Sequence, residues 1–99
     1  MRVRAIAATV LCLGVLAVSS CTGQSCGMGD YAVEGQHGLA TPREVLRSVL
    51  AVNPSLSRDG WLVEGRTARS VVFRSGDDRV DVAKKSDGTW AVAATQACQ

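Results

Sequence analysis

The stretch RSVVFRSGDDRVDVAK, residues 69–84, decides the fold because it contains two strands and the turn that joins them. On each side of the turn apolar residues alternate with polar ones, which is the pattern of a half-buried antiparallel strand. Gly76-Asp77 suits a two-residue type II′ turn, since that turn requires glycine at its first central position. The turn predicts two apolar pairs on one face of the sheet, Phe73 with Val80 and Val71 with Val82.

The same alternation predicts a further strand on each side of this hairpin. Downstream, TWAVAAT (residues 89–95) places Trp90, Val92 and Ala94 on the apolar face. The three-residue loop at 86–88 predicts that Lys84 pairs with Trp90 and Val82 with Val92. Upstream, GWLVEG (residues 60–65) gives the first strand. A slip of one residue in either hairpin would turn the apolar set to the other face, so the register is well specified.

A helix precedes the strands. Thr41-Pro42-Arg43-Glu44 is a capping box with proline at the first helical position. Val45, Leu46, Val49 and Leu50 then form one apolar face, and Asn53-Pro54 ends the helix near Val52. We therefore expect an α+β fold, in which one N-terminal helix packs on a four-stranded antiparallel β-meander, in a domain at residues 41–99. Residues 21–40, which contain five glycines, are expected to be a Gly-rich linker with at most a short strand at 30–33.

The face of the sheet turned away from the helix is the candidate binding surface. The predicted register places small and apolar residues there, and Val72, Ala91 and Ala93 are the candidate partner-binding residues. The alternative is that the segment Tyr31–Val33 covers this face. Arg74 faces Arg79 in the same register, a repulsive pair unless an acid or an anion lies nearby. Two interpretations stay open for this pair, namely contact with anionic lipid headgroups and a solvated surface with neighbouring aspartates.

The first twenty residues are far more apolar than the rest. A short basic start is followed by AIAATVLCLGVLAV (residues 5–18), which as a helix of about 21 Å is shorter than the hydrocarbon core of a bilayer. This pattern is typical of a secretory signal peptide. Leu16-Ala17-Val18-Ser19-Ser20-Cys21 resembles the lipobox of bacterial lipoproteins. The resemblance implies removal of residues 1–20, lipidation of Cys21, and a membrane partner on the extracytoplasmic side of the cell membrane. Ordinary cleavage that leaves a free secreted protein, and an uncleaved membrane anchor, are the alternatives.

Two other cysteines remain after this segment, Cys26 and Cys98. An extracytoplasmic location permits disulfides, and a pair that brackets the mature chain is the natural candidate. Should Cys21 escape lipidation, a Cys21–Cys26 bridge would compete. With the Cys26–Cys98 bridge, only residues 22–25 separate the lipid from the folded unit, a reach of at most about 14 Å.

The remaining composition excludes several classes of function. Arg2 and Arg4 carry the whole excess positive charge of the chain, so we expect no nucleic-acid partner. No metal site or cofactor is expected: the cysteines and the single His37 fall short of a zinc site, and Asp77, Asp78 and Asp81 lack calcium-loop spacing. We expect a non-catalytic binding or accessory module with an envelope protein as its partner. A secreted inhibitor or immunity-type protein and a small envelope enzyme are the alternatives.

Overall fold

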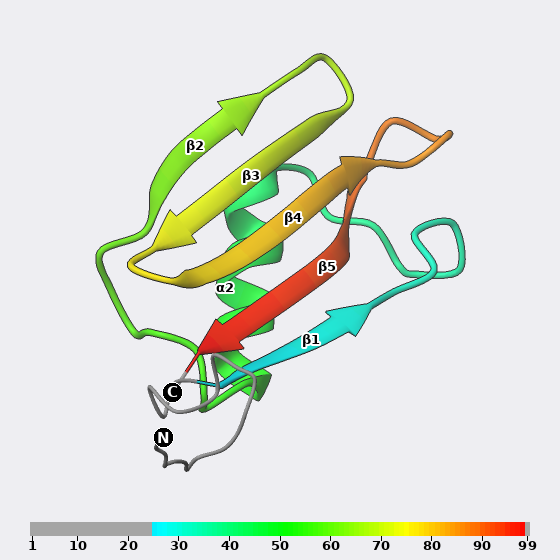
Figure 1. Cartoon of the computed structure of the whole chain (residues 1–99). Helices are drawn as coiled ribbons and strands as arrows, with labels where there is room; N and C mark the ends of the chain where they lie inside the picture. The colour runs from blue at the N-terminus through cyan, green and yellow to red at the C-terminus, as the bar shows by residue number, and fades with distance from the viewer. Residues whose placement is uncertain (1–24, 99) are drawn as a thin grey trace, which may run out of the picture.

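A computed structural model describes residues 25–98 of the chain, and the predicted signal peptide and Cys21 lie outside this range. The described part is a five-stranded antiparallel sheet with a single helix packed across one face (Figure 1). The sheet order is β1-β5-β4-β3-β2. The elements are β1 (Cys26–Asp30), α2 (Pro42–Val52), β2 (Leu62–Arg66), β3 (Ser70–Ser75), β4 (Asp78–Lys84) and β5 (Trp90–Cys98). Within residues 25–98, no helix is long and apolar enough to cross a membrane.

The expected fold, an N-terminal helix on four strands, is wrong. A fifth strand, β1, precedes the helix and pairs antiparallel with β5, so the fold is predominantly β. β1 has the sequence CGMGD and no buried residue, so it lacks the apolar alternation by which the other strands were identified. Its register with β5 runs from Cys26 opposite Cys98 to Asp30 opposite Ala94. Residues 26–30 therefore belong to the sheet, not to a linker.

The registers predicted from the two turns are confirmed. Phe73 pairs with Val80 and Val71 with Val82, and on the other side of β4 Val82 pairs with Val92. Gly76 and Gly88 have φ angles of 60° and 89°, the left-handed region that these turns require of glycine.

One feature of β5 differs from the expectation. A bulge at Ala93 shifts the register, so that Thr95, and not Ala94, pairs with Val80. Ala94 pairs instead with Asp81 and lies on the opposite face of the sheet.

The helix begins and ends where the capping box and the proline predict. The Thr41 hydroxyl accepts a hydrogen bond from the backbone N–H of Glu44, and the Glu44 carboxylate accepts one from the N–H of Thr41. The apolar face of the helix packs on β4 and β5 and closes one core with the inner face of the sheet. The fully enclosed members of this core are Val71, Phe73, Val80 and Val82.

The loop between β1 and the helix continues the pairing along the edge of β5. The side-chain amide of Gln36 takes the place of a peptide group, because it donates to the carbonyl of Val92 (2.6 Å) and accepts from the Val92 N–H (3.1 Å). Leu39 then exchanges backbone hydrogen bonds with Trp90. The backbone of β5 beyond the end of β1 is thereby satisfied without another strand.

Candidate binding face and the disulfide end of the sheet

Cys26 and Cys98 are joined by a disulfide across the β1–β5 pair, as predicted. The bridge links positions 72 residues apart in the sequence. Since Cys26 is bonded to Cys98, the competing Cys21–Cys26 pairing is not formed. The described residues contain no free cysteine.

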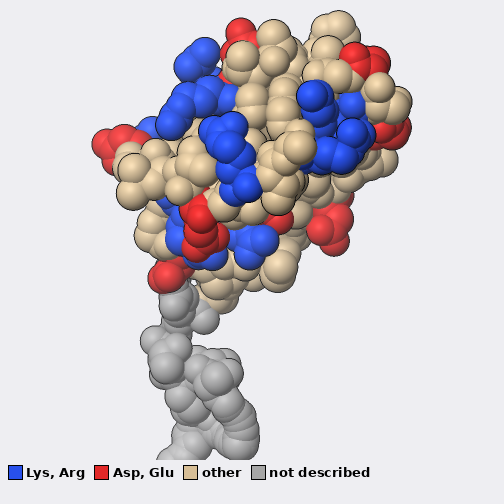
Figure 2. All heavy atoms as spheres, turned by 90° about the horizontal axis from the view of Figure 1, so that it is seen from above, with Lys and Arg blue, Asp and Glu red and all other residues tan. Residues whose placement is uncertain are grey.

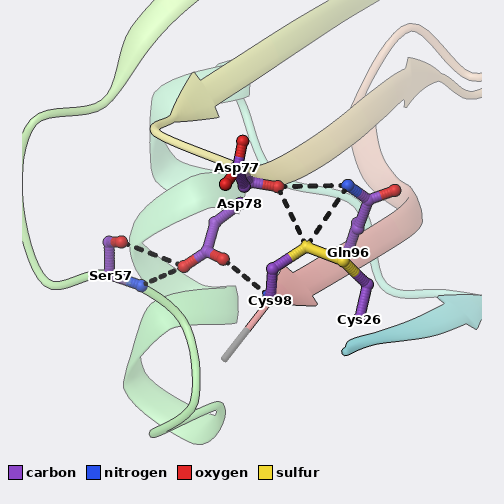
Figure 3. Close-up of a disulfide and its surroundings, with 6 residues drawn as sticks. All are labelled: Cys26, Ser57, Asp77, Asp78, Gln96 and Cys98. Carbon is purple, nitrogen blue, oxygen red and sulfur yellow. Dashed lines mark hydrogen bonds between the residues drawn. A yellow bond between two sulfur atoms is a disulfide. The ribbon is translucent and has the colours of Figure 1, made fainter. Parts of the chain in front are cut away.

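Asp78, at the start of β4, is a buried carboxylate that organises this end of the molecule (Figure 3). One oxygen accepts hydrogen bonds from the backbone N–H and the hydroxyl of Ser57, at 2.8 and 2.9 Å. The other accepts from the backbone N–H of Cys98, at 2.8 Å. Asp78 therefore connects the segment after α2, the β3–β4 turn and the disulfide-bonded end of β5.

Burial and hydrogen bonding act in opposite directions on the pKa of Asp78. Burial raises this pKa, but the donors from Cys98 and Ser57 together outweigh it and hold the pKa below its ordinary value. The charged form is therefore the one that the fold stabilises. In the sequence, Asp78 stands out only as one of three aspartates without calcium-loop spacing. Its burial could not be predicted, because Ser57 approaches it only in the tertiary fold.

The acids of the β3–β4 hairpin do not gather into a metal site. Asp78 turns toward Ser57, whereas Asp81 makes hydrogen bonds with the guanidinium of Arg79. The backbone carbonyl of Asp77 accepts from the side-chain amide of Gln96, at 3.1 Å. Throughout the described range, no group of three or more His, Cys, Asp or Glu residues could hold a metal ion.

We use the name open face for the side of the sheet turned away from α2. The register arranges its residues in three rows across the strands. The first row is Leu62, Arg74, Arg79, Gln96 and Met28; the second is Gly65, Val72, Asp81, Ala94 and Asp30; the third is Ser70, Ala83 and Ala91. Leu62 and Met28, at the two edges of the first row, are 72% and 77% exposed.

The structure divides the three predicted partner-binding residues. Val72 lies half-buried in the second row of the open face. Ala93 is the bulge residue. Ala94 occupies the position opposite Asp81 that regular alternation predicted for Ala93. Ala91 lies in the third row but is buried. Val72 is thus the one member of the predicted set that a partner could reach through the middle of this face.

The loop after β1 packs against the third-row end of the sheet. Lys85, only 8% exposed, donates a hydrogen bond from its ammonium group to the carbonyl of Gln36. Glu34 accepts hydrogen bonds from the N–H and hydroxyl of Ser86, both at 2.9 Å. A Cβ built on Gly38 would overlap the side chain of Thr89, so the backbone of this loop lies directly against the β4–β5 hairpin. Residues 34–38 therefore pack against the β4–β5 turn, whereas the Tyr31 hydroxyl lies 3.5 Å from that of Thr95, the residue paired with the core residue Val80.

The expected repulsion between Arg74 and Arg79 is relieved within the protein. Arg74 lies 2.5 Å from a carboxylate oxygen of Glu64, and Arg79 lies 2.7 Å from one of Asp81. The hydrogen bond from Arg74 lowers the pKa of Glu64, and the hydrogen bond to Asp81 raises the pKa of Arg79. Because each guanidinium has its own carboxylate, the pair needs no anionic lipid to be stable.

A shallow hollow of about 240 Å³ lies on the open face between β1, β5 and β4. Its lining combines the Arg79 guanidinium, two carboxylates and the exposed Met28 side chain. Such a surface can hydrogen bond to peptide groups and bury an apolar side chain, which are the requirements of a protein contact. His37, exposed in the loop before α2, does not line it.

No protein-family model, no curated protein and no solved structure matches the chain.

Proposed function

We propose that the protein is a lipid-anchored module of a bacterial cell envelope, held on the outer side of the membrane through Cys21. The observation that carries this proposal is the Cys26–Cys98 bridge. Structural disulfides persist in oxidising compartments and are rare in the cytosol, so the bridge supports export. The resemblance of residues 16–21 to a lipobox supports lipidation as the means of retention.

If Cys21 carries the lipid, the bridge limits how far the domain can extend from the membrane. The first described strand begins at Cys26, which is covalently tied to β5, so four residues of sequence, 22–25, separate it from Cys21. Four residues reach at most about 14 Å. The disulfide end of the sheet therefore stays close to the bilayer.

We propose further that the domain is a non-catalytic binding module whose open face contacts an envelope protein. Its first two rows offer exposed Met28 and Leu62 at the edges and half-buried Val72 between them. Interfaces of this kind place apolar anchors beside polar groups that are already paired, as Arg74 and Arg79 are here.

Intact-mass spectrometry of the protein from its native membrane tests the anchoring. The expected product begins at Cys21, carries a diacylglyceryl group and has lost two hydrogens to the disulfide. A matched Cys21→Ser chain should lack the lipid. A product cut at the same point without lipid would favour the alternative of a secreted protein. Retention of Met1 with all thiols reduced would refute both.

Photo-crosslinking in intact cells tests the open face. A photoreactive amino acid at Met28 or Leu62 should form the same adduct, because both lie in the first row. Val52, 75% exposed on α2, is the matched control on the other side of the molecule. Equal crosslinking from Val52, or none from either open-face position, would exclude this surface.

A further inference from the structure

The basic side chains of the domain fall into two groups. Among residues 25–98, Arg74, Arg79 and Lys85 have a carboxylate within ion-pair distance, and Arg58 donates hydrogen bonds to backbone carbonyls. No such carboxylate lies beside the other described cations, which are Arg43, Arg47, Arg66, Arg69 and Lys84. Four of these five gather at one end of the molecule.

We use the name basic end for the surface formed by Arg43, Arg66, Arg69 and Lys84. The backbone N–H of Lys84 donates to the carbonyl of Arg69, which places these two residues side by side. Arg66 ends β2 on the other side of the same turn. Arg43 reaches from the first turn of α2 over the ring of Phe73, 5.5 Å from its centre. Figure 2, which views the molecule from this end, shows Lys and Arg side chains in several groups over it, with Asp and Glu side chains among and around them.

The basic end lies opposite the disulfide. β4 begins at Asp78, whose carboxylate accepts a hydrogen bond from the N–H of Cys98, and it ends at Lys84. Six residue steps at about 3.4 Å separate them, which is about 20 Å. Attraction to charged headgroups is screened over about 8 Å at physiological ionic strength. With the tether at the disulfide end, the basic end points away from the bilayer surface.

The shape and chemistry of the basic end indicate the kind of ligand. Two hollows of the described surface, one lined by Met28 and Arg79 and the other by Leu62 and Arg74, contain none of the four cations, which favours a ligand that lies along the surface of the basic end. Two aromatic rings at this end each lie under one of the cations: Phe73 is buried beneath Arg43, and half-buried Trp90 lies 5.8 Å from the ammonium group of Lys84. Neither ring is therefore presented as a bare apolar anchor of the kind that dominates protein interfaces. Three of the four cations are arginines, which bind phosphate through paired N–H donors.

We propose that the basic end binds a linear polymer that carries phosphate groups along its length. Its placement on the side away from the membrane rests on the proposed anchoring, whereas the binding itself does not. The four cations are spread over a strand turn, a strand end and a helix start, which suits a chain that contacts them in succession.

The test is binding of the full chain, purified in non-ionic detergent, to fluorescently labelled long-chain polyphosphate at 50 and 200 mM salt. With four phosphate contacts and the salt dependence of flexible single strands, the affinity should fall about 50-fold across this range. Arg66→Gln/Arg69→Gln should weaken binding at the lower salt and reduce the fall to about 7-fold. Ala51→Glu/Ser55→Glu changes the net charge equally at exposed positions in and after the last turn of α2, and should retain the steep salt dependence.

Three outcomes would overturn the inference. They are no binding at 50 mM salt, equal loss in the two double variants, and preferential binding of phosphatidylglycerol vesicles over polyphosphate through the same arginines. The Cys21→Ser chain separates this inference from the proposed anchoring, because it should bind polyphosphate as well as the wild type does. Polyphosphate binding by a protein that proves to be unlipidated would refute the anchoring alone.

Discussion

Replacing Cys26 and Cys98 by serine should remove a large share of the stability of the domain. The bridge closes a loop between positions 72 residues apart. In the chain-entropy description, removing the bridge increases the conformational entropy of the unfolded chain. This lowers the free energy of unfolding by about 4 kcal/mol. A domain of this size has a total unfolding free energy of about 4–11 kcal/mol. The double variant should therefore be marginally stable, with a melting temperature lower by about 15–30 °C.

The structure also indicates which strand should be destabilised most by removal of the bridge. β1 contains no buried residue and Met28 is 77% exposed, so the bridge and backbone pairing are its main attachments. Amide hydrogen exchange should show loss of protection at Gly27 and Gly29 well before the residues of β3 and β4.

The assay is thermal and urea unfolding of residues 22–99, followed by circular dichroism, since this segment holds every described element and only these two cysteines. Reductant should lower the stability of the wild type to that of the double variant and leave the variant unchanged. A loss below about 1 kcal/mol, or β1 amides that stay protected in the variant, would refute the reasoning.

The remaining predictions concern single contacts. The wild type should lose stability as the pH falls below about 4, because its fold holds the pKa of Asp78 below the unfolded value, so protonation disfavours the folded state. Asp78→Asn should cost about 1–3 kcal/mol at neutral pH and show a smaller loss in acid, as measured by urea unfolding across pH. Gly38→Ala should cost about 1–3 kcal/mol because its new methyl group overlaps the Thr89 side chain, and Thr89→Gly in the same chain should restore much of the melting temperature. Thr41→Ala removes one half of the capping box and should cost about 1 kcal/mol, seen as a lower urea midpoint with an unchanged slope.

Much of the fold could be predicted because local signals agreed with one another. The capping box and Asn53-Pro54 bounded the helix, and the glycines at 76 and 88 fixed both hairpin registers. In each case the chemistry of a few adjacent residues restricts the backbone to one conformation.

What escaped prediction depends on contacts between distant residues. β1 is a strand because β5 offers it a partner and the bridge holds it there, neither of which its own sequence displays. The bulge at Ala93 lies in the small-residue run AVAA, where either face of the strand tolerates the same side chains. The basic end was missed because Arg43 is separated in sequence from the other three cations and joins them only in the folded chain.

The position of the disulfide has a mechanical consequence. Any pull on residue 25 would pass through sulfur directly into β5, which is flanked by β1 and β4 inside the sheet. The outer strand therefore cannot be peeled away one hydrogen bond at a time, and tension must instead shear a central strand against its neighbours on both sides. A protein held at residue 25 and at the opposite end of the sheet would therefore be loaded along its strands, the direction in which all the hydrogen bonds of β5 resist together.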